Sequence, residues 1–179
     1  MKACESNSIL ARAIAAQEAM VAARRAIHRC PELGFEEHAT ARLIANRLGD
    51  LGLEVRTGVG GTGVVAVLRG ASPGPMVALR ADMDALPVSE ETGLPYASAR
   101  PGLMHACAHD MHCAVLLGVA EVLKECVCQM RGTVAFMFQP AEETDGGARA
   151  FIDAGVLTEH EPDAVFGLHM WPDLEVGKV

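Results

Sequence analysis

The sequence predicts an α/β fold, with a mixed, mostly parallel sheet covered by helices. Apolar segments of strand length alternate with longer segments of helical periodicity through most of the 179 residues. Half of the residues are apolar, which is enough to bury one core. Strands that alternate with helices favour parallel pairing, because each crossover helix returns the chain to the same end of the sheet. We therefore expect one domain of this class.

Two helices are expected at the N-terminal end. The segment 8–29 is rich in alanine, Asn7 or Ser8 can cap it, and Pro31 ends it. The second helix covers about 37–51, where apolar residues recur at helical spacing before a glycine.

Short apolar segments predict the strands, and two further segments predict helices. The predicted strands cover residues 53–57, 64–69, 76–80, 133–138 and 164–168. The glycine-rich segment 58–63 joins strand to strand, so it lacks the following helix that a phosphate loop requires. Pro73-Gly74-Pro75 is expected to be a turn, and residues 88–104 to be irregular. The further helices are expected at 110–126 and 147–154.

Charged and imidazole side chains follow three of the predicted strands. Asp82 and Asp84 come after the third strand, Glu142 and Glu143 after the fourth, and His169 directly after the last. In open α/β sheets, ligands bind beyond the carboxyl ends of the strands. These residues are therefore expected to meet at one site.

A fourth group of polar residues precedes the predicted helix 110–126. Cys107 and His109 lie there between two further histidines, His105 and His112. The dipole of a helix N-terminus favours the thiolate and carboxylate forms. Thiolate, imidazole and carboxylate together suit zinc or a similar divalent ion.

Composition excludes several classes of partner. The net charge is −8, and no basic run exceeds Arg24-Arg25, so no nucleic-acid footprint is present. Charged residues interrupt the N-terminal segment before it reaches membrane-spanning or signal-peptide length, so we expect no membrane and a cytoplasmic protein. The six cysteines are accordingly expected to be reduced thiols.

Several motifs, in order along the chain, carry a family resemblance. They are RADMDALP at 80–87, MHACAHDMH at 104–112, QPAEE at 139–143 with GGA at 146–148, GLHMWP at 167–172, and HRCPELG at 28–34. Together they resemble the aminoacylase/carboxypeptidase metallopeptidase family. Within it they are similar to the amidohydrolase subgroup that includes hippurate hydrolase and the hydrolases of indole-acetyl amino acids. The resemblance runs from about residue 20 to the C-terminus.

The resemblance implies roles for individual residues. It implies that the metal ligands are Cys107, His109, Glu143 and His169. Glu142 would then face the substrate water as the general base, and Asp84 would orient the site. In this scheme the metal activates water for attack on the amide bond of an N-acyl amino acid. The metal would be zinc or manganese, with two ions in the complete enzyme.

Two departures from the family pattern bear on activity. Ala108 stands where the subgroup usually has glycine, so a positive φ there would strain the loop. Relatives are roughly twice as long and add a lid and dimerisation domain followed by a returning catalytic segment. We therefore expect residues 1–179 to form the N-terminal part of the metal-binding catalytic domain. A homo-oligomer or a complementing C-terminal chain is the expected macromolecular partner.

Alternatives remain open for some residues and for the activity. Asp82, His105 and His112 could complete a second metal site or could supply supporting hydrogen bonds. The chain could also be a non-catalytic metal-binding remnant or one part of a split enzyme. A cysteine hydrolase using Cys107 with His105 or His109 is the weakest alternative, because it leaves Glu142, Glu143 and His169 without a role.

Overall fold

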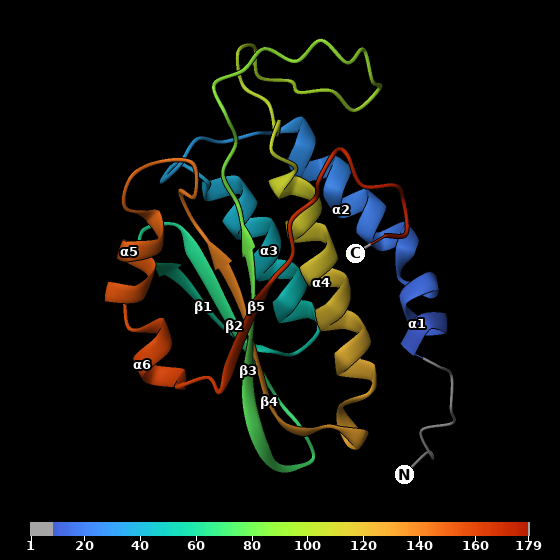
Figure 1. Cartoon of the computed structure of the whole chain (residues 1–179), viewed down its shortest axis with the longest axis vertical. Coiled ribbons are helices and arrows are strands. Elements are labelled where there is room, and N and C mark those ends of the chain that lie inside the picture. Colours follow the sequence, from blue (N-terminus) through green and yellow to red (C-terminus); the bar gives the residue numbers. More distant parts are fainter. Residues whose placement is uncertain (1–8, 179) are drawn as a thin grey trace.

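Five strands form one mixed sheet in the computed structural model, which describes residues 9–178 (Figure 1). The strands are β1 (Glu54–Val59), β2 (Gly63–Arg69), β3 (Ser72–Asp82), β4 (Arg131–Gln139) and β5 (Ala164–Gly167). The helices are α1 (Ile9–Ala15), α2 (Gln17–Arg29), α3 (His38–Asp50), α4 (His109–Glu125), the 3-10 helix η1 (Val127–Gln129), α5 (Gly147–Asp153) and α6 (Val156–His160). The α/β class predicted from the sequence is confirmed.

The strand order across the sheet is β1-β2-β4-β3-β5. β1 pairs with β2, and β2 with β4, in the antiparallel sense. β3 lies between β4 and β5 and is parallel to both. The sheet is therefore mixed, as expected, but it has as many antiparallel as parallel pairings and is not mostly parallel. Its parallel part carries the polar strand ends. β5 forms one edge of the sheet.

Helices cover both faces of the sheet (Figure 1). The alternation of side chains along β4 shows how, because Phe136 and Phe138 point to one face while Ala135 and Met137 point to the other. The larger core packs the first face against α2, α3 and α4, and includes Ile27, Ile44, Leu48, Leu117 and Ala120. On the second face, Phe151 of α5 and Val156 of α6 complete a smaller core.

Three local expectations need correction. The helix expected over 8–29 is divided into α1 and α2 at Ala16, although the backbone there stays in the right-handed helical region. Its expected caps, Asn7 and Ser8, lie outside the described residues. The turn expected at Pro73-Gly74-Pro75 is wrong, because β3 already begins at Ser72 and passes this segment in extended form beside Gly132. Helix α6 was not expected.

The connection from β3 to α4 is long and irregular, as the sequence predicts. It projects beyond the sheet at the end where β3 stops (Figure 1). A single bridge between Leu86 and Met104 closes its base. Among residues 9–178, no helix is long and apolar enough to cross a membrane.

Candidate metal centre

Three neighbouring strands, β3, β4 and β5, carry polar residues at or just beyond their carboxyl ends, which lie at the same end of the sheet. β3 and β4 end level, since Asp82 pairs with Gln139. Two residues beyond Asp82 lies Asp84, and the turn that carries Glu142 and Glu143 follows β4. The parallel register brings these side chains together, as the strand-end argument predicts.

The N-terminus of α4 brings Cys107 and His109 to this end of the sheet. Between them, Ala108 has φ 65° and ψ 22°, which is the left-handed conformation. This backbone bend lets the thiol of Cys107 and the first residue of α4 face the same space. The positive φ that would favour glycine at this position is therefore present, and alanine occupies it.

His109 lies at the centre of the cluster. Its side chain is fully buried, and its Nδ1–H donates a hydrogen bond of 2.9 Å to the backbone oxygen of Asp84. The other ring nitrogen, Nε2, is buried and has no hydrogen-bond partner. It lies 3.6 Å from Asp82 Oδ2, 3.8 Å from Glu142 Oε2 and 3.7 Å from Glu143 Oε1. A buried nitrogen without a partner, facing three carboxylates, is aimed where a cation fits.

Cys107 and His169 complete the cluster. The Sγ of Cys107 lies 3.4 Å from His169 Nε2. His169 Nδ1–H donates to the backbone oxygen of Met170 at 2.7 Å, which leaves Nε2 to point at the cluster. The structure thus brings together the four residues that the resemblance implies as ligands.

The donor set fits a divalent ion. Three groups of donor atoms, each lying within 4.8 Å of one another, share His109: Cys107 with His169, Asp82 with His112, and Glu142 with Glu143. Donor atoms 3.4 to 3.8 Å apart have the spacing of ligands around an ion whose bonds are about 2.1 Å long. The chemistry and the spacing both suit zinc or manganese.

Asp84 holds the turn that carries the two glutamates. Its Oδ1 accepts from the backbone N–H of Glu142 and its Oδ2 from that of Glu143, both at 2.9 Å. Burial opposes ionisation of Asp84, but the hydrogen bond from His109 and the two backbone donors outweigh it and lower its pKa. Asp84 therefore stays ionised and positions the residues around it.

The two glutamates lie in a turn and not in an extended segment. Ala141 has φ 52°, and Glu142 and Glu143 lie in a turn. Both carboxylates approach the same nitrogen of His109 instead of pointing to opposite sides. Glu142 is the more exposed of the two, with 39% of its side chain accessible against 23% for Glu143.

Asp82, His105 and His112 are the residues that the sequence allows either as ligands of a second metal or as supports. Burial would raise the pKa of Asp82, but the hydrogen bond from His112 and the charges of His109 and Arg80 lower it to about 2. His105 is buried, neither ring nitrogen has a partner, and burial lowers its pKa to about 4. It belongs to none of the three donor groups of the described residues.

The pKa of Cys107 is shifted in the direction opposite to the one that the helix dipole alone favours. Burial, a hydrogen bond with Glu143 and the charges of Glu142 and Asp82 raise the pKa of the Cys107 thiol to about 12. A nucleophilic cysteine needs a lowered pKa, so this environment weighs against a cysteine hydrolase. A cation placed among the same carboxylates would oppose this shift, because its charge favours the thiolate.

Two buried glutamates near the site were missed from the sequence. Glu32 accepts from the backbone N–H groups of Ala39 and Thr40 and so caps α3. Glu37 accepts from the backbone N–H of Ala141 at 2.7 Å and thereby fixes the start of the glutamate turn. Neither contact follows from a local pattern, because Glu32 lies outside the usual capping position before α3 and Glu37 lies 104 residues from Ala141 in sequence.

A second polar cluster, also missed, ties α2 to α4. His28 Nδ1 lies 2.8 Å from Asp110 Oδ2, and Arg24 donates to the same oxygen at 2.7 Å. On its other side, His28 Nε2 lies 3.2 Å from Glu90. Burial would raise the pKa of Glu90, but hydrogen bonds from its own loop and from His28 lower it to about 2. This cluster anchors the irregular connection to the helix that carries His109.

A family profile and several known protein sequences are similar to this chain. The profile of Peptidase family M20/M25/M40 matches residues 78–179. N-acetyl-L-cysteine deacetylase of Bacillus subtilis strain 168 is 47% identical over 91% of this chain and 39% of its own length. IAA-amino acid hydrolase ILR1-like 4 of Arabidopsis thaliana is 47% identical over 89% of this chain and 36% of its own length.

A solved structure agrees with this pattern. The YXEP protein of Bacillus subtilis, described as a dinuclear metal-binding peptidase of the M20 family, superposes with a TM-score of 0.86 at 44% identity. The match covers 92% of this chain and 46% of that protein. The chain spans about two fifths of the length of the curated relatives it matches.

Fold and donor set together define an α/β domain built around a candidate divalent-metal centre. More than half of the chain matches the family profile, and that half contains every member of the candidate centre. The chain belongs to Peptidase family M20/M25/M40.

Proposed function

We propose that this chain is the metal-binding part of an amidohydrolase that cleaves the amide bond of N-acyl amino acids. The proposal rests on one observation above all, the buried, partnerless Nε2 of His109 surrounded by a thiol, an imidazole and carboxylates. The relatives that deacetylate N-acetyl-L-cysteine or hydrolyse IAA-amino acids supply the substrate class. Water and the amide would yield a carboxylate and a free amine.

Each polar residue of the centre has a task in this proposal. Cys107, His109, Glu143 and His169 would hold the metal, either zinc or manganese, with a second ion in the complete enzyme. When bound, the ion supplies Lewis-acid chemistry, which favours deprotonation of water and polarises a carbonyl. Glu142, the more exposed glutamate, takes the proton from water and hands it to the leaving amine. Asp84 keeps the backbone of both glutamates in place.

Residues 1–179 would constitute the N-terminal part of the catalytic domain. The lid, the returning catalytic segment and the groups that bind substrate would then be supplied from outside these residues. The share of the relatives' length that the chain covers supports this, as does the exposed edge strand β5, where Phe166 is 58% accessible. A second copy of the chain or a complementing C-terminal chain would cover this edge. Sedimentation of the purified chain tests for the second copy, and sedimentation of a mixture with the C-terminal part of a relative tests for the complementing chain.

The decisive experiment measures metal content and hydrolysis in the same samples. We expect the purified chain, loaded with zinc or manganese and dialysed, to retain metal. Where the substrate-binding segment is supplied, it should release free amine from N-acetyl amino acids. Glu142→Gln should retain the metal and lower hydrolysis by about two orders of magnitude or more. Glu18→Gln, on the exposed face of α2, serves as the control. Absence of metal binding in the wild-type chain would refute the proposal.

The non-catalytic alternative is kept because β5 and His169 are largely exposed. It requires metal binding without turnover by residues 1–179 alone. Hydrolysis by this chain alone, abolished by Glu142→Gln, would exclude it. Activity that survives chelation but is lost on thiol alkylation would instead revive the cysteine hydrolase.

A further inference from the structure

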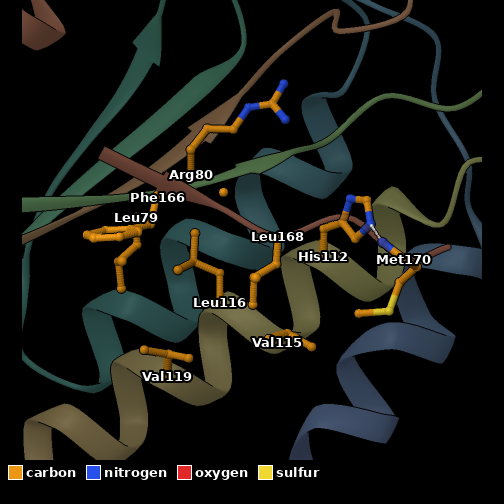
Figure 2. A pocket seen from close by; sticks show the side chains of 10 residues that line it. Leu79, Arg80, His112, Val115, Leu116, Val119, Phe166, Leu168 and Met170 are labelled. Atoms are coloured by element: carbon orange, nitrogen blue, oxygen red, sulfur yellow. Dashed lines mark hydrogen bonds between the residues drawn. The ribbon is translucent and has the colours of Figure 1, made fainter. Parts of the chain in front are cut away.

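The segment that carries His169 has little packing to hold it. It follows the edge strand β5, and the apolar side chains around it are exposed, with Leu168 65% and Trp171 61% accessible. A cavity of about 380 Å³ separates the segment from α4 (Figure 2). The cavity is lined by Leu168 and Met170 on one side and by Val115, Leu116 and Val119 on the other. Apolar contact with α4 therefore does not fix the position of His169.

A hydrogen bond from α4 does reach this segment. The backbone N–H of Met170 donates to Nε2 of His112 at 3.0 Å, as Figure 2 shows. Because Nε2 accepts this bond, the ring proton is on Nδ1, which lies 2.6 Å from Asp82 Oδ1 and donates to it. Both nitrogens of His112 are thus engaged, and its side chain is buried.

On the side away from Met170, the hydrogen bonds of His112 continue through Asp82 into the sheet. Arg80 donates to Asp82 Oδ2 at 2.6 Å and to the side-chain oxygen of Gln139 at 3.0 Å. A series of hydrogen bonds thus runs from β4 and β3 through His112 to the backbone beyond β5. His112 is the only link in this series that contacts the segment after β5.

We propose that His112 is a positioning residue, which holds Met170 through Nε2 while Asp82 fixes its ring through Nδ1, and so places His169 at the metal centre. The ring of His112 also lies against that of His169, with centroids 4.6 Å apart. With both nitrogens occupied, His112 is a support and not a ligand. The link to metal binding rests on the proposed function, whereas the link to the segment does not.

Two substitutions separate the two bonds of His112. In His112→Asn the side-chain amide reaches the place of Nδ1 and can donate to Asp82, but nothing reaches Met170. In His112→Gln the amide oxygen reaches the place of Nε2 and can accept from Met170. His38→Asn, on the exposed start of α3, controls for the loss of a histidine elsewhere.

Trp171, the one tryptophan of the chain, reports on the segment without any metal. It lies next to Met170, with its ring 6.5 Å from that of His169. In chelator-treated protein we expect His112→Asn to lower the fluorescence anisotropy of Trp171 and to increase its quenching by acrylamide. His112→Gln and His38→Asn should stay close to the wild type.

Metal titration gives the second measurement. We expect His112→Asn to weaken zinc binding by about 10- to 100-fold, as is usual when a residue that orients a ligand is lost, and His112→Gln to recover most of the affinity. Unchanged Trp171 signals and affinity in His112→Asn would overturn the proposal, and so would equal losses in both variants. If the wild type binds no metal, the proposed function fails, while the Trp171 comparison still decides whether His112 holds the segment.

Discussion

Asp84→Asn should destabilise the chain strongly, even with no metal bound. The carboxylate of Asp84 is 1% accessible and accepts two backbone hydrogen bonds of 2.9 Å, from Glu142 and Glu143. An asparagine offers one oxygen, so one N–H loses its acceptor and faces an NH₂ group. A buried donor without a partner costs about 1–3 kcal/mol, and the loss of a charged acceptor weakens the bond that remains. We therefore expect a loss of about 2–4 kcal/mol in unfolding free energy.

Urea unfolding followed by circular dichroism, with chelator present, measures this loss. The matched control is Asp153→Asn, which removes an exposed carboxylate paired with Arg149 four residues away. Such a pair contributes only about 0.3–0.5 kcal/mol. If the midpoint and slope for Asp84→Asn give a loss within about 0.5 kcal/mol of the control, the positioning role assigned to Asp84 is refuted.

Three further predictions concern stability. Ala108→Gly should raise the unfolding free energy by about 0.5–1 kcal/mol, because it removes a Cβ from a residue with φ 65°. Ala22→Gly, at an exposed position within α2, should lower it by a similar amount in the same urea assay. Glu90 has its pKa lowered from 4.5 to about 2, so its stabilisation is complete above pH 4.5 and is lost as pH falls towards 2. Glu90→Gln should therefore flatten the pH dependence of stability in that window and cost on the order of 2 kcal/mol at neutral pH; a slope equal to that of the wild type contradicts this. Zinc at 100 times its dissociation constant should raise the unfolding free energy by about 2.7 kcal/mol. Cys107→Ser should largely abolish that gain in a thermal-shift titration, and exposed Cys30→Ser should not.

The sheet and the strand ends could be predicted because they depend on local patterns. Three apolar segments of strand length are each followed by polar residues, namely Asp82, Glu142 and His169. A parallel register places the ends of these strands together, whatever the details of packing. The antiparallel pairing of β2 with β4 could not be predicted. It depends on which strand lies next to which across the sheet, and no local pattern encodes this.

The supports of the site could not be predicted for a related reason. Glu37 reaches Ala141, and His112 reaches Met170, across long separations in sequence. A buried carboxylate and a paired histidine have the same appearance in sequence as their exposed counterparts. The extended Pro73–Pro75 segment shows the same limit, because Gly74 there lies against Gly132, which is distant in sequence.

Because β3 and β4 end at the same level, a residue can be inserted into β3 or removed from it without disturbing the metal centre only at certain positions. Because successive side chains of a strand alternate between faces, one residue inserted between Met76 and Asp82 would turn Asp82 away from His112 and displace Asp84 from the glutamate turn. The only irregularity in the pairing of these strands lies between Ser72 and Met76, at the opposite end of the sheet. Insertions and deletions should therefore be tolerated at that end, and β3 can be re-engineered there without changing the spacing of the metal centre.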